Sequence, residues 1–85
     1  MARGTVRFWA AARAAAGVAE EPFEADNLDD LVAEITRRHG GSDLPRVLGR
    51  SSFLVDGRPA GTRDRRAVEL PEGATVEVLP PFAGG

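Results

Sequence analysis

Apolar and polar positions alternate at the start of the chain, as they do in a strand that buries one face. In residues 6–9, Val6 and Phe8 fall on one face, and Arg7 and Trp9 fall on the other. We therefore expect a half-buried first strand in which Val6 and Phe8 point into the core and Trp9 points outward.

A run of alanines follows this strand. Residues 10–16 are rich in the best helix former, and Gly17 stands where the end of a helix favours a positive φ, so we expect a short helical turn. Residues 18–25 predict a second strand that Phe23 anchors in the core. Because the connection is short, the two strands should pair antiparallel.

The clearest predicted helix follows the second strand. The apolar residues of one helical stripe are Leu28, Leu31, Val32 and Ile35. Asn27 is a suitable N-cap, and Asp29 and Asp30 lie near the positive end of the helix dipole. The two glycines at 40–41 predict the end of this helix, and residues 42–50 are expected to form an irregular connection.

The second half of the chain predicts three more strands. Residues 52–55 form the first, and the Asp-Gly pair at 56–57 is a strong signal for a hairpin turn. Residues 58–60 should then form a short edge strand, because Pro59 cannot donate a backbone hydrogen bond. Residues 75–79 alternate again and predict the last strand, with its two valines inward and its final leucine outward.

This order of elements predicts an α+β domain of the β-grasp, or ubiquitin-like, class. One mixed sheet of about five strands, with one main helix packed on one face, is the economical packing for so short a chain. The first and last strands should lie side by side at the centre of the sheet. We expect residues 1–79 to form this domain and residues 80–85 to form an extended tail.

Composition limits the classes of function. The chain has 85 residues, a net charge of −2, no cysteine and no lysine. Without a basic excess we expect no nucleic-acid partner, and without cysteine neither a disulfide nor a thiolate metal site can form. Residues 1–4 lead directly into a strand pattern, and residues 10–16 are too short to span a bilayer, so we expect a cytoplasmic protein with no membrane partner.

The chemistry of the chain is expected at its end. The last strand is followed by Pro80, Pro81, Phe82, Ala83, Gly84 and Gly85. Two prolines impose an extended path and should project the tail from the body, whereas glycines can pass through a narrow channel. The terminal carboxylate has a typical pKa of about 3.3. It becomes a good electrophile once ATP converts it to an acyl-adenylate.

These features together resemble the ubiquitin-like sulfur carriers, and most of all the small subunits of molybdopterin synthases. The resemblance runs from residue 6 to residue 85. It rests on the opening Val-Arg-Phe-Trp-Ala with its alanine turn, on Phe-Leu-Val-Asp-Gly at 53–57, and on residues 73–85. The Pro-Pro-x-x-Gly-Gly ending is typical of the molybdopterin branch, whereas thiamine-pathway carriers usually lack the double proline. Trp9 departs from the family, where a second phenylalanine is common.

The resemblance implies a mechanism in which the chain is not catalytic alone. A partner adenylyltransferase similar to ubiquitin-activating enzymes would use ATP to adenylate Gly85, and sulfur would then replace AMP to give a thiocarboxylate. The large synthase subunit would bind the tail, residues 80–84, in a channel where Gly84 gives clearance. Sulfur would pass there to a pterin precursor of the molybdenum cofactor. The resemblance implies no permanently bound cofactor and no metal.

Other residues carry weaker hypotheses. Trp9 and Leu79, together with Phe82, could form an exposed apolar patch that binds the partner, or Trp9 could simply pack against the alanine turn. The arginines of residues 63–66 could meet an acidic partner surface or form a solvated loop. His39, the only histidine, is expected to be a cation at a helix C-terminus.

Three alternatives to the molybdopterin pathway stay open at this point. The same sulfur chemistry could serve thiamine, cysteine or tRNA thiolation. The tail could instead be joined to protein amines, as in a ubiquitin-like modifier. The chain could also be an interaction module with an inert tail. The product formed at the C-terminus distinguishes these alternatives.

Overall fold

The computed structural model describes residues 1–81, and the predictions for residues 82–85 lie outside this part of the chain. In chain order the elements are β1 (Arg3–Phe8), α1 (Ala10–Ala16), β2 (Glu20–Glu24), α2 (Leu28–Arg38), α3 (Leu44–Leu48), β3 (Ser52–Val55), β4 (Arg58–Pro59), the 3₁₀ helix η1 (Arg65–Ala67) and β5 (Thr75–Leu79). The predicted strands and the main helix are all present.

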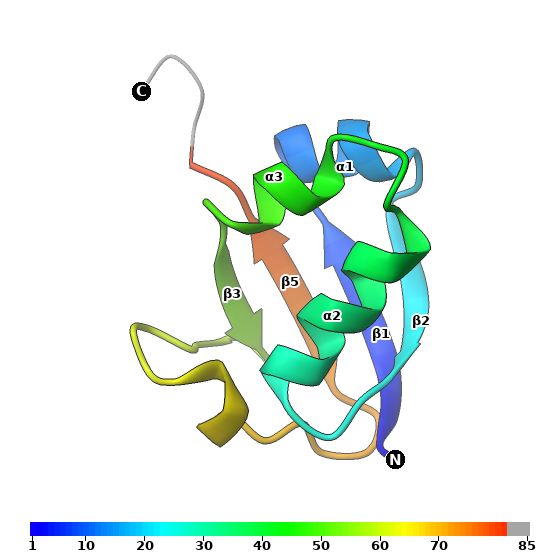
Figure 1. Cartoon of the computed structure of the whole chain (residues 1–85). Helices are drawn as coiled ribbons and strands as arrows, with labels where there is room; N and C mark the ends of the chain where they lie inside the picture. The colour runs from blue at the N-terminus through cyan, green and yellow to red at the C-terminus, as the bar shows by residue number, and fades with distance from the viewer. Residues whose placement is uncertain (82–85) are drawn as a thin grey trace.

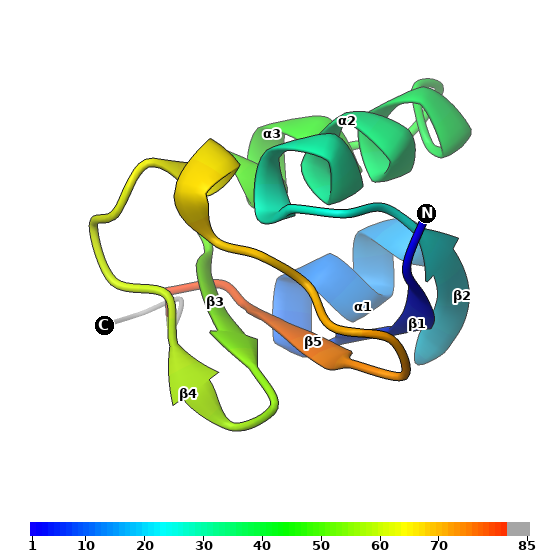
Figure 2. The ribbon, with the colours of Figure 1, turned by 90° about the horizontal axis from the view of Figure 1, so that it is seen from below.

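The strands form one mixed sheet in the order β2-β1-β5-β3-β4. β1 and β5 lie side by side at its centre and run parallel, whereas the other neighbouring pairs are antiparallel. Figures 1 and 2 show α2 and α3 packed on one side of the sheet, with α1 near the end where β1 finishes. The predicted β-grasp arrangement is confirmed.

The core lies between the sheet and α2. Val6 and Phe8 of β1 and Val76 and Val78 of β5 are buried, as their alternation predicts. Three of the four apolar stripe residues of α2 are also buried, and the fourth is half-buried. Two strands and one helix thus turn their apolar faces toward a common interior.

The predicted turn signals also hold. Gly17 ends α1 with φ +79°, and its N–H donates to the carbonyl of Arg13. Asn27 caps α2 by accepting a hydrogen bond from the backbone N–H of Asp30 at 2.8 Å. The hairpin between β3 and β4 has positive φ at both central residues, 56 and 57, as a type I′ turn requires.

The prediction of an irregular connection over residues 42–50 is wrong, because this segment contains α3. Pro45 lies in the first turn, where a proline is tolerated in a helix. Leu44, Val47 and Leu48 are buried. A five-residue helix is too short to show a clear period, so contacts with α1 and α2 stabilise it more than local preference does.

One predicted boundary differs. Trp9 was expected on the first strand, but the strand ends at Phe8 and Trp9 is the N-cap of α1. The predicted end of the main helix is confirmed, because α2 ends at Arg38 with His39 as its C-cap, directly before the glycines of 40–41. Neither glycine has a positive φ.

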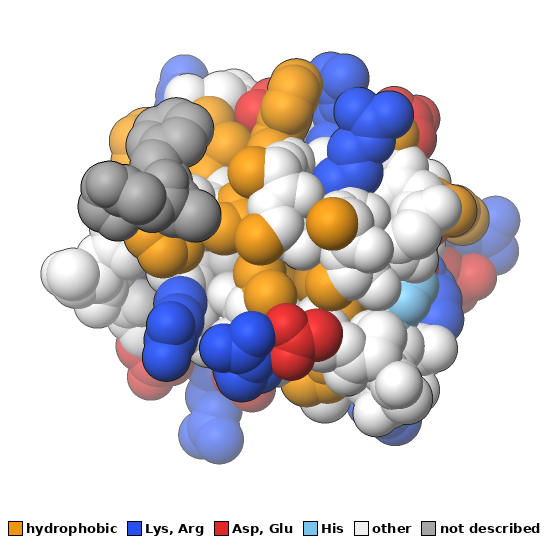
Figure 3. Space-filling view, turned by 90° about the horizontal axis from the view of Figure 1, so that it is seen from above, with side chains coloured by type: hydrophobic (Ala, Val, Ile, Leu, Met, Phe, Trp, Pro, Cys, Tyr) orange, Lys and Arg blue, Asp and Glu red, His pale blue; other side chains and the backbone are white. Residues whose placement is uncertain are grey.

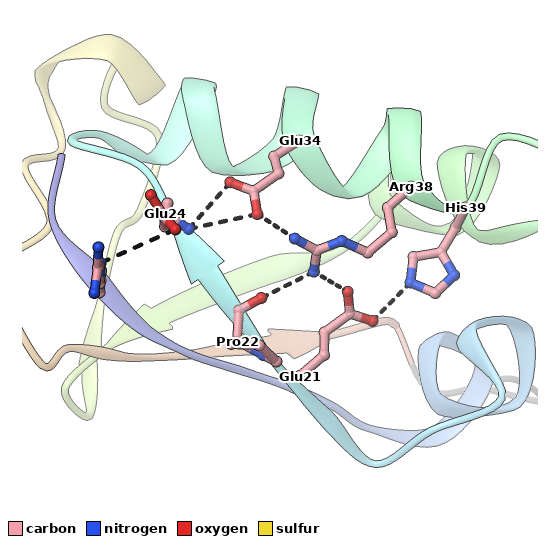
Figure 4. A network of polar contacts seen from close by, with 7 residues as sticks. Glu21, Pro22, Glu24, Glu34, Arg38 and His39 are labelled. Carbon is pink, nitrogen blue, oxygen red and sulfur yellow. Dashed lines mark hydrogen bonds and ion pairs between the residues drawn. The ribbon is translucent and has the colours of Figure 1, made fainter.

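A polar network joins the last turn of α2 to β2 (Figure 4). Arg38 forms ion pairs with Glu21 and Glu34, and it also donates to the carbonyl of Pro22 at 2.9 Å. The His39 Nε2 atom lies 2.6 Å from the Glu21 carboxylate. Hydrogen bonding to Glu21 raises the pKa of Arg38 above its usual value. The cationic end of α2 is therefore held by a carboxylate from β2, whose side chain is only 11% exposed.

The same contacts cover the outer edge of β2, which is an edge strand. The backbone N–H of Glu24 donates to the carboxylate of Glu34 at 3.1 Å. The carbonyl of Pro22 accepts from Arg38, and Pro22 has no N–H. An edge whose backbone groups are already bonded is a poor template for another strand. The network thus protects the sheet from strand addition on this side.

We expect Gly4→Ala to lower the free energy of unfolding by about 1–3 kcal/mol, a typical cost of overpacking. A Cβ at this position would lie 2.2 Å from the carbonyl oxygen of Ala74 and 2.7 Å from the ring of Phe23. Urea denaturation measures the change. Gly41→Ala is the control, because a Cβ added there would meet nothing within 4 Å. Equal stability of the two variants would contradict the crowding at Gly4.

We expect Glu21→Ala to lower the free energy of unfolding by about 1–3 kcal/mol, because it leaves Arg38 and His39 without their shared carboxylate. The matched control is Glu20→Ala, whose side chain is 56% exposed and pairs only with Arg7. This control should change stability by less than about 0.5 kcal/mol. Thermal and urea unfolding compare the two variants, and a larger loss for Glu20→Ala would show that the network is not stabilising.

Candidate functional site

The tail leaves the body at the carboxyl end of the central strand β5. We call Leu79, Pro80 and Pro81 the tail root. Leu79 is half-buried, Pro80 is buried and Pro81 is exposed. The double proline was expected to project from the body, but burial of Pro80 means that the first proline still packs against it. In Figure 1 the tail root lies at the opposite end of the molecule from the N-terminus.

The two residues predicted at a partner interface both lie at this end. The backbone N–H of Trp9 donates to the carbonyl of Val78 at 3.3 Å, which extends the pairing of β1 and β5 by one residue. The side chain of Trp9 is 40% exposed, and that of Leu79 is half-buried. The structure therefore places them on adjacent strand ends at the tail root, and their role in an interface stays a prediction.

Trp9 also has contacts within the chain. Its carbonyl accepts hydrogen bonds from the N–H groups of Ala12 and Arg13 in the first turn of α1. The guanidinium of Arg7 lies 5.2 Å from the centroid of its ring, within the range of a cation–π interaction. Arg7 also forms an exposed ion pair with Glu20 at 3.6 Å. The indole is thus oriented by its neighbours while one part of it faces solvent.

The sheet face away from α2 carries side chains of three neighbouring strands. The strand register aligns Arg7 of β1 and Leu54 of β3 with Glu77 of β5, which lies between them. Leu54 alternates with the buried Phe53, so its side chain belongs to this outer face, where it is half-buried.

Figure 3 shows the end of the molecule from which the tail leaves. Hydrophobic side chains gather across this end, and arginine side chains lie around them. One of the ion pairs at this end joins Arg46 of α3 to Asp43 through two hydrogen bonds of 2.9 and 2.6 Å. The pair lowers the pKa of Asp43 and raises that of Arg46. Because both groups are exposed, this pair shapes the charge of the surface more than it stabilises the fold.

Within residues 1–81, no group of three or more His, Cys, Asp or Glu side chains is arranged to hold a metal ion. In the same part of the chain, no helix has both the length and the apolar composition needed to cross a membrane. The remaining candidate group is the terminal carboxylate of Gly85, which together with Phe82, Ala83 and Gly84 lies outside the described residues.

Residues 6–85 match the ThiS family. No curated protein sequence matches the chain. A putative molybdopterin converting factor subunit 1 from Pyrococcus furiosus has a similar structure, with 29% identity and a TM-score of 0.75. That comparison covers 96% of this chain and 100% of the Pyrococcus chain.

Two further solved structures share the fold. Small archaeal modifier protein 1 from Methanosarcina acetivorans has 23% identity and a TM-score of 0.85, over 100% of this chain and 98% of its own. A chain in the complex of subunits 1 and 2 of the molybdopterin-converting factor from Helicobacter pylori has 22% identity and a TM-score of 0.67, over 98% of this chain and 99% of its own. At these identities the likeness extends to the fold alone.

Proposed function

The chain belongs to the ThiS family, and from that premise we propose that it is a sulfur carrier for molybdenum-cofactor synthesis. The observation that carries the proposal is the Pro-Pro-x-x-Gly-Gly ending, which follows directly from the central strand of a ubiquitin-like sheet. In this proposal Gly85 bears the sulfur, and the chain acts as the small subunit of a two-component molybdopterin synthase. It is not catalytic alone.

The proposed chemistry has two steps at Gly85. The terminal carboxylate attacks the α-phosphate of ATP in a partner adenylyltransferase, which releases pyrophosphate and leaves an acyl-adenylate. A sulfur nucleophile then displaces AMP, and the product is a thiocarboxylate. Glycine suits both steps because no side chain blocks the approach to the carbonyl carbon. The chain has no lysine, so no internal side-chain amine competes for the activated acyl group.

The structure of the domain suits a carrier whose C-terminal tail is bound by another protein. The parallel pairing of β1 and β5 holds the tail root, and the buried Pro80 limits motion of the chain at that point. Residues 80–84 are proposed to enter a channel of the large subunit, with Trp9 and Leu79 in contact with its rim. The double proline and the 29% identity to a molybdopterin converting factor subunit favour this pathway over the other sulfur acceptors.

The first test is a tag fused after Gly85, compared with the same tag placed before Met1. A C-terminal tag removes the free carboxylate, so we expect no thiocarboxylate and no cofactor production, although the protein stays folded. The N-terminal tag lies at the opposite end of the molecule and should leave thiocarboxylate formation and cofactor production unchanged. Intact mass spectrometry after incubation with ATP, the adenylyltransferase and a sulfur source detects one sulfur in place of one oxygen.

The same experiment separates the alternatives. An isopeptide bond to another protein would identify a ubiquitin-like modifier. An unchanged mass in the complete reaction would mean that the tail is inert. Full cofactor production by the C-terminally tagged protein would contradict the proposal.

The second test concerns the interface. Trp9→Glu should weaken binding to the large subunit by about 1–2 kcal/mol, because it places a charge among apolar contacts. Val18→Glu is the matched control, since Val18 is exposed to a similar degree, 44% against 40%. Isothermal titration calorimetry measures both affinities. If Trp9→Glu binds as tightly as the unmodified chain, Trp9 is not in the interface.

A further inference from the structure

The structure separates the three arginines of the charged loop between β4 and β5. Arg66 forms an ion pair with Asp29 of α2, with 3.7 Å between Nε and Oδ2. Arg63 and Arg65 instead line a recess of about 280 Å³ next to β3. Among the described residues, neither of these two guanidiniums lies within ion-pair distance of a carboxylate. Two of the three loop cations thus have no acidic partner in the body of the protein.

The recess has the chemistry of an anion site. Ser51, Ser52 and Thr62 are the polar uncharged residues of its lining, and no acidic residue lines it. A second hollow that Arg63 also lines differs in this respect, because Asp56 and Glu69 line it. Positive charge therefore predominates in the recess, although the whole chain has a net charge of −2.

Both guanidiniums are held in place without using all their donors. The Nε–H of Arg63 donates to the carbonyl of Ala60 at 3.1 Å, which leaves its terminal N–H groups for a ligand. The guanidinium of Arg65 lies 5.1 Å from the centroid of the Phe53 ring. Stacking on an aromatic ring leaves the N–H groups at the edge of a guanidinium able to donate. Donors ordered in this way lose less conformational entropy when they bind a carboxylate.

The recess is adjacent to the tail root. Ser52, which lines it, is the register partner of Leu79, the last residue of β5. A protein that encloses the tail would therefore come close to this part of the surface. An acidic side chain on its near side would be attracted by the two arginines.

We propose that this recess binds an acidic side chain of the large subunit that receives the tail. The carboxylate would accept hydrogen bonds from Arg63 and Arg65 and would fix the rotation of the carrier about its tail. The identity of the occupant rests on the function proposed above. The arginines would act as a second contact, on the side of the tail root away from Trp9, and charge attraction would also speed association.

The test compares Arg63→Glu/Arg65→Glu with Arg66→Glu in calorimetric binding to the large subunit. All three arginines lie in the same loop, but Arg66 is turned toward Asp29. We expect the double variant to bind about tenfold more weakly or worse, and to lose most of the salt dependence between about 50 and 500 mM NaCl. Arg66→Glu should bind within about twofold of the unmodified chain. Circular dichroism checks that both variants are folded.

Four results would overturn the inference. The double variant could bind as tightly as the unmodified chain, or Arg66→Glu could be weakened equally. Inorganic phosphate could bind the unmodified chain but not the double variant, while neither phosphate nor the substitutions change the affinity for the large subunit. That result would assign the recess to a free anion. If the unmodified chain does not bind the large subunit at all, the proposed function fails and this occupant with it.

Discussion

The parallel pairing of β1 and β5 is the constraint on which the rest of the structure depends. It joins the two ends of the chain at the centre of the sheet, so every other strand is added outside this pair. Their inward residues, Val6 and Phe8 with Val76 and Val78, are almost completely buried against α2. Because parallel strands end on the same side, the tail root and Trp9 lie together, at the end opposite the N-terminus.

Both edges of the sheet are protected against pairing with another strand. On one side, Glu34 and Arg38 bond to the outer backbone groups of β2, and on the other side β4 has only two residues, one of them Pro59. Short, proline-containing or covered edges discourage strand addition. The two edges are therefore poor sites for binding a partner by strand addition. A small domain with little interior to spare can place its function at its surface and at a chain end.

The arginine side chains differ in the groups that hold them in place. Arg38 connects α2 to β2 through its ion pair with Glu21, which His39 also contacts, and Arg66 connects η1 to α2 through Asp29. In the loop between β4 and β5, Arg63 and Arg65 are ordered by a carbonyl and an aromatic ring instead of by carboxylates. Arginines of one loop thus have different kinds of contact, according to which acidic groups the fold brings near them.

Much of this protein could be predicted from local pattern. Alternation placed the valines of β5 and Phe8 in the core, the Asp-Gly pair at 56–57 specified the hairpin, and the order of elements led to the β-grasp sheet. The tail motif indicated the candidate reactive group. These features are readable because strand and turn preferences act over a few neighbouring residues.

Only the tertiary structure decided the features that depend on residues distant in sequence. The helix α3 is too short to be recognised from its period and is buried through contacts with other helices. Pairing of His39 with Glu21, burial of Pro80, and the separation of Arg66 from Arg63 and Arg65 follow from which segments pack together. Local sequence specifies the faces of each element, whereas the packing of those faces determines which charged groups meet and which remain available to a partner.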